Sequence, residues 1–273
     1  MCTEIYIQLL LIFILIFTII TLIWAKSQSN TIHSENFEKK ALLVVSIGDN
    51  RPFFNIMKNH YQHYANKIGA DLVVKQYTSI PKEYLKKIDF YKPEFKENSE
   101  KFRRRLMKMI FLREILENYD RVLLMDDSCF IMPETPNLFD LVPSDTIGAV
   151  KDLGLLGSLN GNDCINTGVM VVSKEQYPFF KDFEKYYHEC NLAIKENKFK
   201  WVGVDQSVIN YAIQKKILKV TFLDPVFNVV TTLITNELME KKQAYIFNLT
   251  GTFENLKLKR ANFLVKNNPI PMV

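Results

Sequence analysis

Residues 119–128 read Tyr-Asp-Arg-Val-Leu-Leu-Met-Asp-Asp-Ser and are the most informative stretch of the chain. The run predicts the end of a helix, then a buried strand, then two carboxylates, Asp126 and Asp127, at the strand's carboxyl end. In open α/β sheets, ligands bind just beyond the carboxyl ends of the strands. Carboxylates placed there can hold a divalent cation, and the cation can hold a diphosphate. The competing interpretation is an ordinary acidic turn, so the flanking segments must decide.

Those segments alternate between strands and helices. An apolar run at 41–47 predicts a buried parallel strand, and apolar residues then recur at helical spacing over 53–68, with Pro52 in the first turn and Gly69 as the C-terminal cap. Further strands are predicted at 70–74, 147–150, 165–172, 218–223 and 244–247, and further helices at 102–116, from Ser173 to about Cys190, and at 201–216. This alternation predicts an α/β fold: one mostly parallel, Rossmann-like sheet with helices on both faces.

Composition excludes several classes of protein. The 273 residues carry a net charge of +5, and the 35 basic and 30 acidic side chains are mixed along the chain, so no nucleic-acid-binding stripe is present. The four cysteines have no CxxC spacing, which argues against a zinc site and a disulfide framework and favours buried thiols.

The N-terminus predicts a membrane anchor. Residues 5–24 contain no charge and are long enough to span the hydrocarbon core of a bilayer. A cleaved signal peptide is the alternative, but no basic segment precedes the apolar run. We therefore expect an anchor over 1–26, a polar stalk over 27–40 and a catalytic body over 41–273. Lys26, Lys39 and Lys40 follow the span, and by the positive-inside rule they favour a cytoplasmic body.

Two groups of residues are candidates for binding a nucleotide. Ser46 and Gly48 end the first strand, where the first βα turn of such folds borders the nucleoside. The helix at 102–116 opens with a basic run, Arg103, Arg104, Arg105 and Lys108. A solvated basic face is the common outcome for such a run. The sharper interpretation is that Arg104 and Lys108 reach a diphosphate.

Five segments follow one another in an order that is informative: residues 55–71 with Tyr64-Ala65 and Gly69-Ala70-Asp71, residues 119–131, residues 138–152, Asn166 to Val171, and Asp205 to Asn210. Together they resemble the GT-A glycosyltransferases, and most closely those of family 8, the glycogenin-like and galactosyltransferase-like enzymes. Weaker echoes are Leu223-Asp224-Pro225 with Asn228, and residues 244–251. The resemblance covers nearly the whole body and implies a GT-A fold.

The resemblance also implies a manganese or magnesium site, but with a degenerate DxD motif. Asp126 stands at the first DxD position, Ser128 stands where the family has a second Asp, and Asn248 stands where it has a His. Neutral oxygens bind hard cations more weakly than carboxylates do. Asp127 could compensate, although the middle residue of the motif faces the other side of a strand. A metal-independent site with basic residues of 257–260 near the phosphates is the alternative.

The resemblance places the remaining roles on three residues. Asn166 would contact the donor sugar, and Asp205 with Gln206 would lie beside the anomeric carbon or hold sugar hydroxyls. Taken singly, Asn166 is a turn residue and Asp205 a helix N-cap. We expect Asp126, Asn166 and Asp205 to converge around one cleft sized for an activated sugar.

The resulting expectation is a membrane-anchored glycosyltransferase that moves a sugar from a nucleotide-sugar donor, first of all a UDP-sugar, to a glycan, protein or lipid acceptor. The resemblance implies a Golgi or ER lumenal body, against the flanking charges, and retention of anomeric configuration. A nucleotide-sugar-binding protein without catalysis is the alternative. A nucleotidyltransferase is a weaker one, because the loop at 48–51 has a single glycine. Asn248-Leu249-Thr250 is a glycosylation sequon that tests the location.

Overall fold

The computed structural model describes residues 18–21, 38–48, 51–91, 99–152, 164–200, 203–230, 239–250 and 253–270. The chain divides into two units, Met1–Glu38 and Lys39–Val273. No helix within the described ranges is long and apolar enough to cross a membrane. The anchor expected over 1–26 and the stalk over 27–40 lie outside the described residues, apart from 18–21 and 38–40, and stay predictions.

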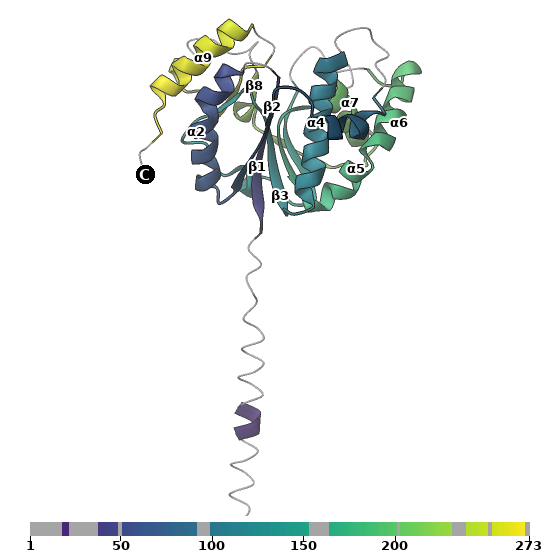
Figure 1. The fold of residues 1–273 in the computed structure, drawn as a ribbon. Coiled ribbons are helices and arrows are strands. Elements are labelled where there is room, and N and C mark those ends of the chain that lie inside the picture. Colours follow the sequence, from purple (N-terminus) through teal and green to yellow (C-terminus); the bar gives the residue numbers. More distant parts are fainter. Residues whose placement is uncertain are drawn as a thin grey trace, which may run out of the picture. The chain divides into compact units, whose positions relative to one another are not determined.

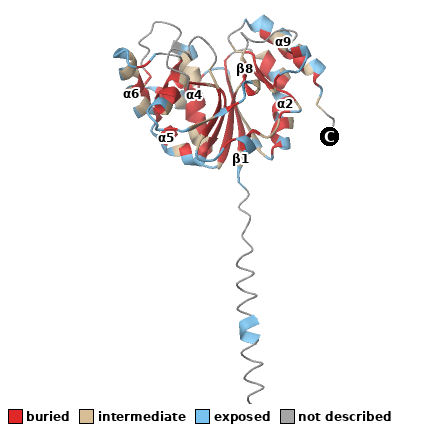
Figure 2. Ribbon diagram, turned by 180° about the vertical axis from the view of Figure 1, so that it is seen from behind, coloured by how far each residue is buried: buried red, intermediate tan, exposed pale blue. Residues whose placement is uncertain are grey.

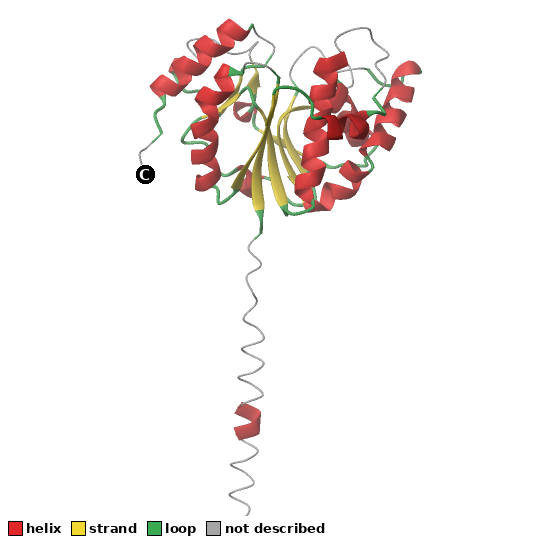
Figure 3. Ribbon diagram, in the orientation of Figure 1, coloured by secondary structure: helices red, strands yellow, loops and turns green. Residues whose placement is uncertain are grey.

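The second unit is built on a six-stranded sheet in the order β2-β1-β3-β6-β5-β7 (Figures 1 and 3). Its strands are β1 (Lys40–Ile47), β2 (Asp71–Tyr77), β3 (Arg121–Asp126), β5 (Ile147–Lys151), β6 (Ile165–Ser173) and β7 (Val220–Leu223). The pairs β1/β2, β1/β3 and β5/β7 are parallel, whereas β6 is antiparallel to both of its neighbours. The mostly parallel sheet is therefore confirmed, with one reversed strand.

The reversal of β6 determines where the site lies. Met125, near the end of β3, pairs with Val169. The first residues of β6 consequently lie at the same edge of the sheet as the carboxyl end of β3. A buried apolar run carries no information on strand direction, so the sequence could not predict this.

Both faces of the sheet are covered, as Figure 2 shows by the buried residues along its strands. Alternate residues of β1 enter two separate cores: Leu43 and Val45 join one, and Leu42 and Val44 join the other. The first core is closed by α4 (Ser99–Leu116), α5 (Tyr177–Lys181), α6 (Phe183–Lys195) and α7 (Val204–Gln214), and the second by α2 (Pro52–Lys67) and α9 (Glu254–Asn267). The helices on both faces are confirmed.

A smaller sheet, β4-β9-β8, adds to the second core. Its strands are β4 (Cys129–Ile131), β8 (Val229–Val230) and β9 (Ile246–Asn248). The strand predicted at 244–247 thus exists, but placing it in the main sheet was wrong. In β4/β9 pairing, Cys129 stands opposite Asn248. This pairing brings Asn248 beside Ser128, although 120 residues separate them in sequence.

Local sequence explains several element ends. Pro52 occupies the first turn of α2, and Gly69, with φ of +64°, follows its end, where Ala70 N donates to Ala65 O over 2.9 Å. Ser173 N donates to Gln176 Oε1 over 2.8 Å, as the predicted capping box requires. The single helix expected after Ser173 is instead broken at Asp182. The short elements are α3 (Lys82–Leu85), η1 (Lys86–Ile88), η2 (Leu138–Leu141), η4 (Lys174–Gln176) and η5 (Pro225–Phe227).

Candidate active site

Lys108 bridges two carboxylates that lie 79 residues apart in the sequence. Its Nζ lies 2.8 Å from Asp126 Oδ1 and 2.8 Å from Asp205 Oδ2. Lys108 comes from α4, Asp126 ends β3, and Asp205 lies in the first turn of α7. Three residues, Asp126, Asn166 and Asp205, were predicted to converge. The buried ammonium group of Lys108 holds two of them, Asp126 and Asp205, together.

Lys108, Asp126 and Asp205 form a triad in which burial and neighbouring charges shift pKa values in opposite directions. Burial alone would lower the pKa of Lys108, but Asp126 and Asp205 raise it above its ordinary value. Burial would also raise the pKa of Asp205, yet Lys108 and Arg105 hold it below its ordinary value. The Thr167 hydroxyl donates to Asp205 Oδ2 over 3.1 Å. Lys108 and Asp205 are consequently both charged at neutral pH.

A chain of neutral groups lies next to the triad. Ser128 Oγ donates to Asn248 Oδ1 over 3.0 Å and Asn248 Nδ2 to Asn228 Oδ1 over 3.1 Å. Asn228 Nδ2 donates in turn to Asn166 Oδ1 over 2.8 Å. Ser128, Asn228 and Asn248 are all buried. Three predicted residues, Ser128, Asn166 and Asn248, thus belong to one hydrogen-bonded row, which we call the amide row.

Gly168 joins the amide row to the triad. A Cβ atom on Gly168 would lie 2.3 Å from Asn248 Nδ2, 2.9 Å from Asn166 Oδ1 and 3.2 Å from Asp126 Oδ2. These three side chains therefore surround one point on the backbone of β6. Together with the Lys108 bridge, this contact shows that Asp126, Asn166 and Asp205 converge.

Asp127 lies apart from this cluster. Its carboxylate accepts from Arg51 Nε over 2.8 Å and forms an ion pair with the guanidinium. The Tyr61 hydroxyl contacts its backbone oxygen, and Tyr61 belongs to the second core. Burial raises the pKa of Asp127, and Arg51 opposes that shift. Asp127, the first turn residue after β3, is therefore held by Arg51 and does not join Asp126.

The end of β1 meets α4. Gly48 has φ of +142°, and a Cβ on it would lie 2.7 Å from Arg104 Nη1. Ser46, two residues earlier, is buried. Gly203, which precedes α7 with φ of +130°, has Arg105 Nη1 at 3.4 Å from the corresponding position. Arg104 and Arg105 of the basic run therefore each approach a different loop, and the run is not a purely solvated face.

Gln206 is tied to the end of β5. Its Nε2 donates to Asp152 Oδ2 over 2.6 Å. Gln206 follows Asp205 in the first turn of α7, but it is held by a different partner. The two residues of this pair are therefore oriented separately, Asp205 by Lys108 and Gln206 by Asp152.

No protein-family model matches the sequence, and the curated proteins give no match either. Several solved structures do resemble this chain. A glycosyltransferase involved in the glycosylation of the major capsid of PBCV-1 superposes with a TM-score of 0.55 and 15% identity, over 82% of this chain and 99% of that one. The galactosyltransferase LgtC, in complex with donor and acceptor sugar analogs, gives 0.53 and 12%, over 85% and 97%. Mouse xyloside xylosyltransferase 1 gives 0.50 and 12%, over 85% and 100%.

The chain has a GT-A fold. GT-A proteins generally use a divalent cation, so the donor atoms of this site must be tested against that need. Asp126 Oδ1 already accepts from Lys108. Asn248 Oδ1 accepts from Ser128 and from Thr250 N, over 3.0 and 3.1 Å. In the described part of the chain, no cluster of three or more His, Cys, Asp or Glu side chains could hold a metal. Because these oxygen atoms already accept hydrogen bonds within the protein, the residues of this candidate site do not fit the cation.

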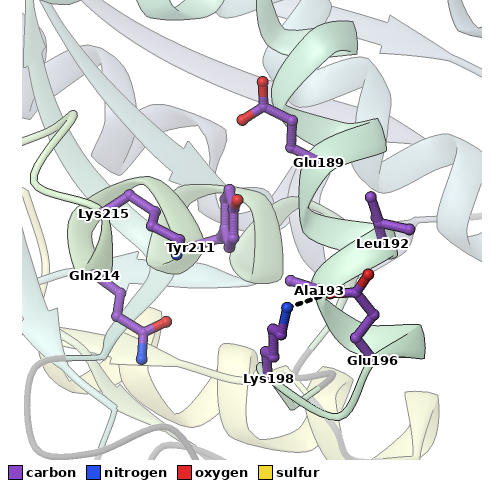
Figure 4. A pocket seen from close by; sticks show the side chains of 8 residues that line it. All are labelled: Glu189, Leu192, Ala193, Glu196, Lys198, Tyr211, Gln214 and Lys215. Atoms are coloured by element: carbon purple, nitrogen blue, oxygen red, sulfur yellow. Dashed lines mark ion pairs between the residues drawn. The ribbon is translucent and has the colours of Figure 1, made fainter.

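Two further features are the basic residues of α9 and a pocket between α6 and α7. In α9, Lys257 Nζ pairs with Glu254 and lies 5.2 Å from the centre of the Phe53 ring, and so packs on α2. A pocket between α6 and α7 is lined by charged residues of both signs, among them Glu189, Lys198 and Lys215 (Figure 4). None of the predicted site residues lines this pocket.

Sequence reasoning placed Arg105 in the basic run but assigned the diphosphate to Arg104 and Lys108, and it missed Thr167 and the Arg51 partner of Asp127. Arg105 could have been assigned as well, because positions 105 and 108 share one helix face, as 104 and 108 do. Thr167 lies between Asn166 and Gly168 in a motif that was otherwise recognised. Arg51 carried no signal, since its partner Asp127 is 76 residues away.

Proposed function

We propose that this protein is a glycosyltransferase that moves a sugar from a nucleotide-diphosphate sugar to an acceptor. The observation that carries the proposal is the convergence of Asp126, Asn166 and Asp205 at one edge of a GT-A sheet. Ligands of open α/β sheets bind at this edge. The structural neighbours named above are glycosyltransferases, which supports the reaction class.

The arrangement suits glycosyl transfer chemically. The transition state carries positive charge on the sugar ring and growing negative charge on the leaving diphosphate. Asp126, which is partly exposed, can accept a hydrogen bond from a sugar hydroxyl, and the buried Asp205 favours the ring charge through its field. Arg104 and Arg105 favour the charge on the phosphates. We assign Ser46 and Gly48 to the nucleoside side and Asn166 and Gln206 to the sugar side.

Donor-dependent turnover tests the proposal. The full-length protein is incubated with a panel of UDP- and GDP-sugars, and release of the nucleoside diphosphate is measured. We expect release from at least one donor, and a loss of roughly 100-fold in Asp205→Asn, the scale of removing one preorganised electrostatic group. Asp145→Asn is the matched control, because Asp145 pairs with Lys219 on the exposed surface.

A catalytically inactive nucleotide-sugar-binding protein is the second candidate. The neutral residues Ser128 and Asn248 at positions where a carboxylate and a histidine were expected favour it. Nucleotide binding without release from any donor would establish this candidate. If the protein neither binds a nucleotide nor turns over a donor, both candidates are wrong. The acceptor class, the anchor over 1–26 and a Golgi or ER location stay predictions from the sequence.

A further inference from the structure

We propose that the donor diphosphate is neutralised by cations of the chain itself, Arg104 and Arg105, in place of a divalent metal ion, while Lys108 occupies the place of that ion between Asp126 and Asp205. The inference rests on the proposed function, because it concerns how the same site holds its nucleotide. It follows from the mismatch between the donor atoms and the cation that GT-A proteins generally use.

The ammonium of Lys108 stands against the carboxylate that a metal would need. A divalent cation binds carboxylate oxygens at about 2.0–2.6 Å. Lys108 Nζ already lies 2.8 Å from Asp126 Oδ1 and 2.8 Å from Asp205 Oδ2. A divalent ion on the same carboxylate would face a buried like charge a few ångströms away, which is costly in a low-dielectric site.

The amide row also directs nitrogen, not oxygen, at this point. Its orientation is fixed at both ends by backbone N–H groups, which can only donate: Thr250 N to Asn248 Oδ1 over 3.1 Å and Gly168 N to Asn166 Oδ1 over 2.8 Å. Asn248 Nδ2 therefore faces β6 beside Asp126. An amide N–H can only donate a hydrogen bond, so this buried nitrogen is a poor neighbour for a metal ion.

Positive charge is arranged in a row along α4. Arg104 and Lys108 are four residues apart, and Arg105 and Lys108 three, so all three side chains share one side of the helix. Arg104, whose Nε also pairs with Glu100 over 3.2 Å, reaches Gly48 after β1, and Arg105 reaches Gly203 before α7. The row thus runs between the two loops that flank Asp126, where a diphosphate would lie. Guanidinium groups bind phosphate oxygens in a bidentate manner, which gives geometry as well as charge.

Calorimetry on the full-length protein tests the inference. UDP and GDP are titrated separately in the presence of EDTA and then of MnCl2 or MgCl2. We expect the tighter of the two nucleotides to bind with a dissociation constant that changes by less than about twofold between EDTA and metal. Tightening of about tenfold or more on adding Mn²⁺ or Mg²⁺ would overturn the inference and leave the proposed function standing. Binding of neither nucleotide under any condition would overturn both.

A variant pair separates the α4 cations from general charge. Lys108→Met leaves two aspartates without a partner and risks misfolding, so Arg105→Gln is the primary variant. In EDTA, Arg105→Gln is expected to weaken nucleotide binding by about tenfold. Arg113→Gln, on the same helix eight residues further on, should change it by less than about twofold. Equal effects of the two substitutions would contradict a role for Arg105 in holding the diphosphate.

Discussion

A methyl group on Gly168 would lie 2.3 Å from the amide nitrogen of Asn248. That separation is far below van der Waals contact, so β6 and β9 can approach as they do only because residue 168 has no side chain. The contact is made at the point where the amide row meets Asp126.

Gly168→Ala should therefore damage the site more than the fold. Asn248 and Asn166 must move to admit the methyl group, and we expect nucleotide affinity to fall by at least about tenfold. Gly69→Ala is the contrasting control, because its Cβ meets nothing within 4 Å but its φ is +64°. That control should cost about 1 kcal/mol of stability without changing the affinity of the folded protein. Unchanged affinity in Gly168→Ala would contradict the assignment of this point to the site.

Lys108→Met should lower the free energy of unfolding by about 2–3 kcal/mol, because it removes the partner of two carboxylates, one of them deeply buried. Without Lys108, burial should raise the pKa of Asp205 in the folded variant. Asp205 then takes up a proton as the pH falls, and the loss in free energy of unfolding relative to the unchanged protein should become smaller. Lys87→Met is the matched control: its partner Glu114 and Lys87 itself are partly exposed, so a loss under about 1 kcal/mol is expected. Denaturant titrations at two pH values measure both effects. Equal losses in the two variants would rule out the buried bridge.

His60 should make stability depend on pH in mildly acidic solution. Burial, against the ring of Phe130, lowers its pKa from the ordinary 6.5 to about 4. The unfolded chain therefore binds the proton more readily, and the free energy of unfolding should fall between pH 6.5 and 4 by at most about 3 kcal/mol. Above pH 6.5 the effect is absent. His60→Gln should flatten this slope, while His188→Gln, an exposed histidine, should keep it.

Asn248 should carry no glycan in the folded protein. Its side chain is 0% exposed and is engaged in the amide row, although Asn248-Leu249-Thr250 is a glycosylation sequon. After expression through a secretory pathway, the monodisperse fraction should show no mass change on glycosidase treatment. A folded, nucleotide-binding fraction with a glycan on Asn248 would contradict the burial of this residue and its place in the site.

Much of the architecture could be predicted because burial periodicity is local. The run at 41–47 indicated a strand, and its alternating residues do enter two cores. The direction and the pairing of strands depend on contacts between distant segments. Periodicity therefore could not predict the reversal of β6 or the smaller sheet β4-β9-β8. Predicting them would have required knowing which other strand each short apolar segment pairs with.

The candidate site could be predicted in part, because its residues lie in sequence motifs whose order resembles a known family. Asp126, Asn166 and Asp205 come from three recognised segments, and the structure brings them together. What the sequence could not convey is which polar atoms are already paired. The sequence allowed Asp127 to compensate for the missing carboxylate, but the structure pairs it with Arg51. From the sequence, Asp205 and Gln206 were expected to share one role, but the structure binds Gln206 to Asp152.

The amide row has a further consequence for the conditions under which the protein works. Hydroxyl and carboxamide groups neither gain nor lose protons anywhere in the biological range, unlike the carboxylate and imidazole expected at positions 128 and 248. A fall in pH would therefore leave the amide row uncharged. The hydrogen bonds within the row would persist at any acidity that the fold itself survives.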